Sequence, residues 1–138
     1  MIPEISVVMS VYNAKETVAH AVESVLSQTF RNFEFIIVDD GSSDETSKIL
    51  HSFSDDRIKI LKNNHNYIDS LNIGMSHAKG RFIARMDADD YMHPDRLRFQ
   101  VNFMKTHTDI DICGTWMQTY GRFYGIISNG FGKIDNMV

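Results

Sequence analysis

Residues 33–38 read FEFIIV, an almost unbroken apolar run, and Asp39 and Asp40 follow it directly. Such a run is typical of a strand that is covered on both faces, as strands of a parallel sheet are. Similar apolar runs occur at residues 5–11, 57–61 and 81–86. Each run is followed by apolar residues at helical spacing, and strands that alternate with helices form right-handed βαβ units. The sequence therefore predicts an α/β fold, a Rossmann-like three-layer sandwich with a mainly parallel sheet.

Capping signals and apolar spacing predict where the helices begin and end. Asn13 and Glu16 are spaced as an N-cap pair before a first helix, and SSDE at residues 42–45 has the form of a capping box before a second. Gly80 is the expected C-cap of a third helix, and a fourth follows Pro94. The residues expected to face the core are Val18, Ala21, Val22, Val25, Ile49, Leu50, Phe53, Leu71, Met75, Ala78, Leu97, Val101 and Met104.

The last part of the chain has a different character. We expect residues 110–114, IDICG, to form a further strand with Cys113 as a small core residue. Glycines and aromatic residues follow without an amphipathic period. The sequence therefore predicts a domain at residues 1–118 and a tail at residues 119–138 that is either a flexible extension or the truncated start of a further region.

Composition excludes several classes of protein. The chain has 138 residues, 43% of them hydrophobic, which is enough for one globular core. A single cysteine rules out a disulfide scaffold, and the formal net charge of −4 argues against nucleic-acid binding. No apolar stretch is long enough to span a membrane, and the first residues lack a basic segment, so we expect a cytoplasmic protein.

Acidic and polar residues follow three of the predicted strands. These clusters are SVYN at residues 10–13, DDGS at residues 39–42 and DADD at residues 87–90. Ligands of open parallel sheets bind at the carboxyl ends of the strands, near the point where the strand order reverses. The sequence therefore predicts that these clusters meet at one ligand site.

Asp87 and Asp89 are candidate metal ligands. Residues two apart in an extended chain point to the same side, so the two carboxylates can flank one divalent cation. Mg²⁺ prefers oxygen ligands and takes the rest of its shell from water and substrate phosphates. The alternative is that an aspartate at this strand end caps the next helix, and for Asp90 the two interpretations are equally open.

Asp39, Asp40 and Tyr12 are candidate nucleotide ligands. Adjacent side chains point apart, so one aspartate is expected to face a ligand and the other to bind the turn at residues 41–42. A carboxylate can accept a hydrogen bond from a base N–H or a ribose hydroxyl. Tyr12 can stack on a base, although packing is the more common role of an aromatic residue at a strand end.

Several stretches of the chain occur together, in the same order, in one known family. They are SVVMSVYN at 6–13, SQTF at 27–30, IVDDGSSD at 37–44, LNIG at 71–74 with AKG at 78–80, and MDADD at 86–90 with PDRL at 94–97. On these motifs, residues 5 to about 118 resemble the nucleotide-sugar-binding half of family 2 inverting glycosyltransferases of the GT-A fold.

The resemblance implies a set of site residues and a reaction. Ser10, Tyr12 and Asp40 would border the base, with UDP the most expected nucleotide. Asp87 would lie near the ribose and diphosphate, and Asp89, helped by Asp87, would bind a Mg²⁺ or Mn²⁺ ion. The family transfers a sugar with inversion from a nucleoside diphosphate to an acceptor hydroxyl, and the cation stabilises the leaving diphosphate.

Two features depart from the family pattern. The chain reads Asn64-His65-Asn66 where the family often has Asn-x-Gly, and because Asn tolerates a left-handed backbone we expect the turn to survive. The family's general base belongs to an acceptor half, which we expect beyond Val138. The 138-residue chain is therefore expected to bind donor and metal but to transfer sugar poorly.

Two other functions are consistent with parts of the sequence. One is a non-catalytic nucleotide-sugar-binding module. The other is a receiver-like signalling domain, although Lys62-Asn63 and Gly114-Thr115 stand where a phosphoacceptor Asp and a Lys would be needed. For the transferase we expect a saccharide or lipid-linked acceptor, peripheral association with the inner face of the membrane, and self-association through an open sheet edge.

Overall fold

The computed structural model describes residues 2–119 and 125–127 and divides into two compact units, Met1–Leu97 and Arg98–Val138. The first unit holds strands β1 (Ile5–Val11), β2 (Phe33–Asp39), β3 (Ile58–Lys62) and β4 (Phe82–Asp87) and helices α1 (Val18–Leu26), α2 (Thr46–Leu50) and α3 (Tyr67–Ser76). Among the described residues, no helix has the length and apolar character that crossing a membrane requires.

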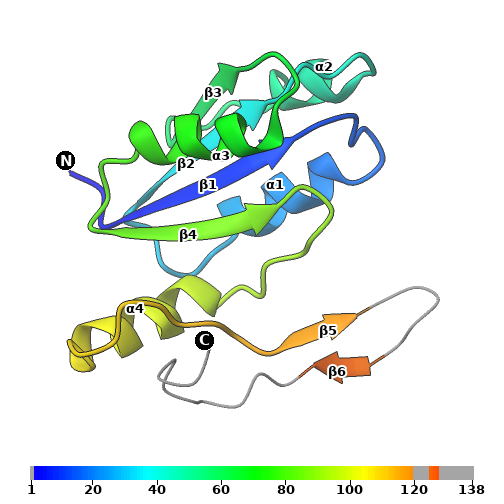
Figure 1. The fold of residues 1–138 in the computed structure, drawn as a ribbon. Coiled ribbons are helices and arrows are strands. Elements are labelled where there is room, and N and C mark those ends of the chain that lie inside the picture. Colours follow the sequence, from blue (N-terminus) through cyan, green and yellow to red (C-terminus); the bar gives the residue numbers. More distant parts are fainter. Residues whose placement is uncertain (1, 120–124, 128–138) are drawn as a thin grey trace. The chain divides into compact units, whose positions relative to one another are not determined.

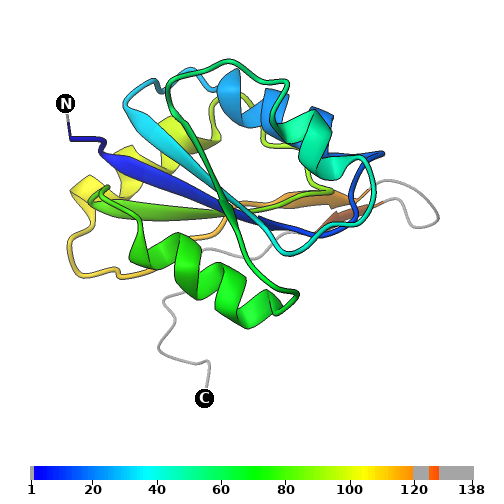
Figure 2. The same cartoon turned by 90° about the horizontal axis from the view of Figure 1, so that it is seen from above.

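The first unit is a three-layer sandwich around one parallel sheet. The strands lie in the order β3-β2-β1-β4, and every neighbouring pair is parallel. Helix α3 covers one face of the sheet, and α1 and α2 cover the other (Figures 1 and 2). This architecture confirms the α/β fold class with a mainly parallel sheet.

The core lies in the two central strands. Val7 of β1 and Phe35, Ile36 and Ile37 of β2 are fully buried, because helices cover both faces of the sheet there. The chain runs from β1 outward to β3 and then returns to the other side of β1 for β4. The order of the strands therefore reverses between β1 and β4, and their carboxyl ends are aligned, with Ser10 opposite Asp87.

The predicted start of the first helix is wrong. Helix α1 begins at Val18 with Thr17 at the N-cap position, and Asn13 lies outside it with a left-handed φ of 46°. The Asn13 side chain instead accepts hydrogen bonds from the backbone of Ser43 and Asp44, which belong to the loop after β2. Asn13 therefore joins two loops and does not cap a helix.

The capping box predicted at residues 42–45 is also absent. Helix α2 is short, with Glu45 at its N-cap position and no side-chain cap, and the Ser42 hydroxyl accepts a hydrogen bond from the backbone N–H of Asn13. Within the expected apolar stripe only Leu50 is fully buried, and Ile49 and Phe53 are half-buried.

Helix α3 ends earlier than predicted, and two glycines explain its placement. It stops at Ser76, with His77 as its C-cap, and Met75 is exposed where a core position was predicted. A Cβ at Gly74 would lie 2.5 Å from Val8 Cγ1, so the missing side chain lets the helix approach β1 closely. Gly80 is not a cap: a Cβ there would lie 2.5 Å from the backbone nitrogen of Ser6.

Helix α4 (Arg96–Thr106) leads into the second unit, where β5 (Met117–Thr119) pairs antiparallel with β6 (Gly125–Ile127). The strand predicted at residues 110–114 does not form, and Cys113 is only half-buried. The IDICG stretch alternates polar and apolar residues but has no strand partner among the described residues. Most of the tail at residues 119–138 lies outside the described residues, so the predicted division at residue 118 stays a prediction.

An ion pair at the amino end of β3 gives a pH-dependent contribution to stability. Asp55 accepts hydrogen bonds from the backbone N–H, Nε and Nη2 of Arg57 at 2.8–3.0 Å. These bonds lower the pKa of Asp55 from 3.8 to about 2. A carboxylate with a lowered pKa stabilises the fold above pH 3.8, and this contribution is lost as the pH falls towards 2.

We expect Asp55→Asn to lower the free energy of unfolding at pH 7 by about 1–2 kcal/mol, after allowance for the partial exposure of the pair. The difference from the wild type should shrink between pH 4 and pH 2, roughly the interval over which Asp55 takes up its proton. Urea denaturation of both proteins across this range measures it. A difference that stayed constant with pH would contradict this account of the pair.

Candidate functional site

A pocket of about 380 Å³ opens where the order of the strands reverses, at the carboxyl ends of β1 and β4. Its lining residues are Ser10, Tyr12, Asn13, Ala14, Thr17, Tyr67, Asp87, Ala88 and Asp89. All of them belong to the first unit. Open parallel sheets bind ligands at this position because the loops on the two sides of the reversal run apart and leave a crevice.

Hydrogen bonds between two loops hold the β1 side of the pocket in place. Besides the bonds made by the Asn13 side chain, the backbone N–H of Ala14 donates to Thr46 Oγ1 at 2.8 Å, and that of Lys15 donates to Asp44 Oδ2 at 3.3 Å. Hydrogen bonds from the side chain and the backbone N–H of Thr46 to the Asp44 carboxylate lower the pKa of Asp44. The loop after β1 is therefore fastened to the loop after β2, which fixes the backbone next to Tyr12.

Tyr12 presents an aromatic ring to the pocket. Its side chain is 45% exposed, and its ring packs against the imidazole of His65, with the centroids 4.1 Å apart. His65 has a left-handed φ of 49°, whereas Asn66 is extended and caps α3. The left-handed residue of the turn at residues 64–66 is therefore His65, so the expectation that an asparagine takes this conformation is wrong.

Asp40 is buried and does not line the pocket. Its Oδ1 accepts hydrogen bonds from Ser70 Oγ at 2.7 Å, the backbone N–H of Asn66 at 2.8 Å and Asn63 Nδ2 at 3.2 Å. Its side chain is 3% exposed, and Oδ2 lies 4.0 Å from His65 Nδ1. Asp40 therefore organises the loop before α3, and its contact with a base stays a prediction.

Asp39 is buried as well. Its Oδ1 accepts a hydrogen bond from the backbone N–H of Ser42 at 3.0 Å, which is the turn contact that the sequence predicts for one of the two aspartates. Both carboxylates at the end of β2 thus bind loops of their own unit. Neither is among the residues that line the pocket.

Two of the three acidic residues at the carboxyl end of β4 face the pocket. Asp87 and Asp89 both line it, and Asp87 Oδ1 forms an ion pair with Arg85 Nη2 at 2.6 Å. Partial burial, followed by the charges of Asp87 and Asp89, raises the pKa of Asp90. The acids therefore lie close enough to repel one another, and a cation would relieve that repulsion.

The donor set fits a cation that substrate phosphates help to hold. Within the described ranges, no three His, Cys, Asp or Glu side chains gather closely enough to bind a metal ion by themselves. Mg²⁺ is usually bound by one or two carboxylates together with water and phosphate oxygens. Asp87 and Asp89 supply two exposed carboxylates at the pocket wall, and two carboxylates are the number of protein ligands that such a site needs.

The loop after these acids is anchored to the carboxyl end of α1. Gln28, which is fully buried, donates from Nε2 to the carbonyls of Met92 and His93 and accepts at Oε1 from the backbone N–H of Leu97. Ser24 Oγ accepts a hydrogen bond from the backbone N–H of Met92 at 3.0 Å. Side chains at the end of one helix therefore fix the segment that follows Asp90.

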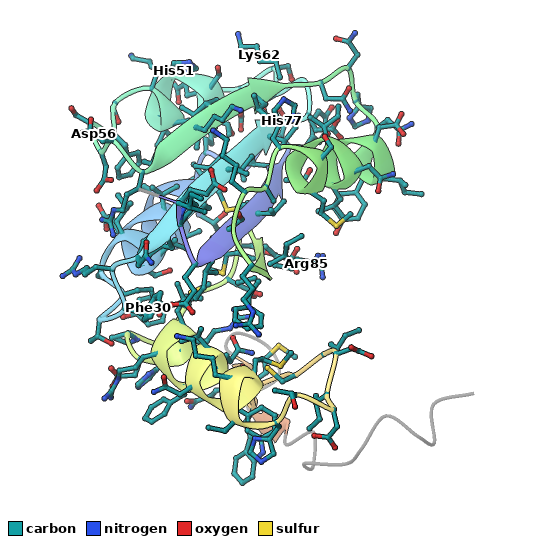
Figure 3. All side chains as sticks on the ribbon, turned by 90° about the vertical axis from the view of Figure 1, so that its left-hand side faces the viewer. Phe30, His51, Asp56, Lys62, His77 and Arg85 are labelled. Carbon is teal, nitrogen blue, oxygen red and sulfur yellow. The ribbon has the colours of Figure 1, made fainter. Side chains whose placement is uncertain are left out.

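Besides Ala14 and Thr17, which line the pocket, Tyr67 and Arg85 were not predicted from the sequence. Tyr67, the first residue of α3, lines the pocket, and its hydroxyl accepts a hydrogen bond from Arg85 Nη2. The side chain of Arg85 projects from β4, one of the two edge strands of this sheet (Figure 3). Arg85 could have been predicted, because side chains two residues apart in a strand point to the same face of the sheet, and Asp87 was already a predicted site residue. No sequence pattern pointed to Tyr67.

The chain is similar in sequence to known proteins over most of its length. The family model of glycosyl transferase family 2 matches residues 6–131. EpsE of Bacillus subtilis is 41% identical over 126 residues, which cover 88% of this chain and 45% of EpsE. An Escherichia coli protein, UDP-Glc:alpha-D-GlcNAc-diphosphoundecaprenol beta-1,3-glucosyltransferase WfaP, is 41% identical over 104 residues, which cover 74% of this chain and 41% of WfaP.

Solved structures share the fold. The crystal structure of S. aureus TarS 1–349 superposes with a TM-score of 0.71 at 26% identity, over 76% of this chain and 33% of that chain. TarS has also been solved with UDP and with UDP-GlcNAc. The mannosyltransferase PcManGT from Pyrobaculum calidifontis, solved with GDP-Man and Mn²⁺, has the same fold, with a TM-score of 0.68 at 20% identity.

The parallel sheet, with an aromatic and acidic pocket at its switch point, is an α/β fold of the GT-A type. The chain belongs to glycosyl transferase family 2. This membership decides against the receiver-like interpretation. The chain spans less than half the length of the relatives named above.

Proposed function

We propose that this chain binds a nucleoside-diphosphate sugar, with UDP as the preferred nucleotide, as the donor-binding part of an inverting glycosyltransferase. The observation that carries the proposal is the pocket itself. It brings Ser10, Tyr12, Asp87 and Asp89 to one crevice from strands that are far apart in the sequence. The UDP and UDP-GlcNAc complexes of TarS support the choice of nucleotide.

Each side chain of the pocket has a role that its chemistry suits. The Tyr12 ring, backed by His65, offers a flat apolar surface on which a base can stack. The Ser10 hydroxyl can donate to or accept from a base or ribose. Asp40 acts indirectly, because it holds the loop that places His65 against Tyr12.

Asp87 and Asp89 are the residues that would hold a divalent cation, Mg²⁺ or Mn²⁺. When bound there, such an ion would supply positive charge that stabilises the leaving diphosphate. The pair also orients the diphosphate relative to the base site at Tyr12. Orientation of the donor before reaction is itself a large part of catalysis by transferases.

The acceptor is proposed to be a saccharide or a lipid-linked saccharide. The name of WfaP specifies a diphosphoundecaprenol-linked acceptor, which supports this choice. A lipid-linked acceptor requires an enzyme that works at a membrane surface, so we propose a cytoplasmic protein that associates with the inner face. The general base is not assigned to any residue.

Calorimetric titration of the chain with UDP and GDP, with and without Mn²⁺, tests the proposal. We expect UDP to bind in a metal-dependent manner, with a dissociation constant in the micromolar range, and GDP to bind more weakly. A chain that binds neither nucleotide in the presence of Mn²⁺ would refute the proposed function. Turnover of a UDP-sugar by a protein that contains the chain then separates a transferase from a non-catalytic binding module.

A further inference from the structure

Arg85, Tyr67 and Asp87 form a network at the wall of the pocket. Arg85 Nη2 donates to the Tyr67 hydroxyl and forms an ion pair with Asp87 Oδ1 at 2.6 Å. Tyr67 and Asp87 both line the pocket. The guanidinium therefore lies between two side chains of the site, next to the carboxylates that would hold a cation.

Stability does not account for this network. The side chains of Arg85 and Asp87 are 55% and 42% exposed, and ion pairs that are this exposed contribute little to folding. The ion pair can therefore be broken at little cost to folding, and Asp87 lies in the pocket, where a ligand can reach it.

The charge of Arg85 opposes the binding of a bare cation. A positive charge in contact with Asp87 compensates that carboxylate and lowers the negative potential at Asp89. The same guanidinium is a good ligand for phosphate, because its planar fork of N–H groups matches two phosphate oxygens. A diphosphate that enters the pocket can therefore replace Asp87 as the ion-pair partner of Arg85. The Asp87 carboxylate is then available to bind the cation.

We propose that Arg85 is an exchangeable counter-ion: it pairs with Asp87 in the free protein and transfers to the diphosphate when donor and cation bind together. The Tyr67 hydroxyl holds the guanidinium near the pocket in both states. The proposal rests on the proposed function and deepens it, because it makes cation binding depend on the nucleotide. Mn²⁺ alone then binds weakly, and Mn²⁺ with UDP binds strongly.

Arg85→Gln tests the exchange through two opposite effects. Loss of the positive charge should strengthen the binding of Mn²⁺ alone by about threefold or more. Loss of a charge-assisted bond to phosphate should weaken the binding of UDP at saturating Mn²⁺ by about tenfold. Electron paramagnetic resonance of free Mn²⁺ measures the first effect, and calorimetry measures the second.

Arg81→Gln is the matched control. It removes the same charge just before the amino end of β4, whereas the pocket lies at the carboxyl end. We expect both affinities of this variant to stay within about twofold of the wild type, because the charge is exposed and distant from the pocket. Arg85→Lys should keep the weak binding of Mn²⁺ alone but regain only part of the affinity for UDP, since lysine lacks the planar fork.

The outcomes distinguish the exchange from a purely structural role of Arg85. If both affinities of Arg85→Gln fall together, the guanidinium only supports the pocket wall and the exchange is refuted. It is refuted as well if neither affinity changes or if Arg81→Gln gives the same result. When the wild type binds UDP and Mn²⁺ but Arg85→Gln matches it, only the exchange fails; a wild type that binds no UDP removes the proposed function and the exchange together.

Discussion

Asp89→Asn is expected to abolish metal-dependent nucleotide binding, with a loss of at least about 100-fold in affinity for UDP at saturating Mn²⁺. Asparagine has nearly the shape of aspartate but offers a neutral carbonyl oxygen, which is a much weaker ligand for a hard cation. The binding of UDP without metal should change little, because the lost interaction runs through the cation. Calorimetry with and without Mn²⁺ measures both quantities.

Asp56→Asn is the control for this variant. Asp56 is an exposed acid just before the amino end of β3, away from the carboxyl ends of the strands where the pocket lies (labelled in Figure 3). The Asp56→Asn variant should bind UDP and Mn²⁺ as the wild type does. If Asp89→Asn retained metal-dependent binding within a few fold of the wild type, Asp89 would not be the cation ligand, and the role would have to pass to Asp87 or Asp90.

Asp40→Ala is expected to lower the free energy of unfolding by about 3–5 kcal/mol. The substitution removes the buried acceptor for Ser70 Oγ, Asn66 N and Asn63 Nδ2 and leaves these donors without it in the interior. The loop before α3 would then lose the contacts that define it. Denaturation in urea, followed by circular dichroism, measures the loss.

Two further variants show which property of Asp40 matters. Asp40→Asn keeps an oxygen that can accept these bonds and should cost only about 1–2 kcal/mol, and Ser70→Ala removes one donor and should cost about 1 kcal/mol. An Asp40→Ala protein that unfolded like the wild type but no longer bound UDP would contradict the structural role. That result would make Asp40 a direct ligand of the nucleotide.

The sheet could be predicted from the sequence because its signals are local. Phe35, Ile36 and Ile37 lie in a run that is apolar on both faces, and such a run is typical of a strand between two layers of helices. The positions of Asp87 and Asp89 at the switch point followed from the same strands. These predictions needed no knowledge of which distant residues approach one another.

The predictions that failed depended on distant partners. Asn13 has a side chain that can cap a helix or accept bonds from a neighbouring loop, and the backbone of Ser43 and Asp44 reaches it only in the folded protein. Gly80 resembles a helix C-cap in sequence, but the backbone of Ser6 explains the need for glycine there. Both residues were recognised as special, and their partners could not be read from local spacing.

The site was predicted in part for the same reason. Ser10, Tyr12, Asp87 and Asp89 come from strand ends, whose convergence the topology dictates, and all of them line the pocket. Asp40 also follows a strand, but its donors come from the loop and helix after β3, and these side chains draw its carboxylate inward. Tyr67 enters the site because Gly74 allows α3 to lie close against β1.

The anchoring of the loop after Asp90 by Ser24 and Gln28 bears on how much the protein must rearrange to take up its donor. This loop follows closely on Asp89, which lines the pocket, and buried amide and hydroxyl groups already hold it in place, so it has little conformational freedom left to lose. Binding at the neighbouring acids should therefore carry a small entropic penalty. When the donor binds, individual side chains would then change conformation while the backbone of this part of the molecule stays fixed.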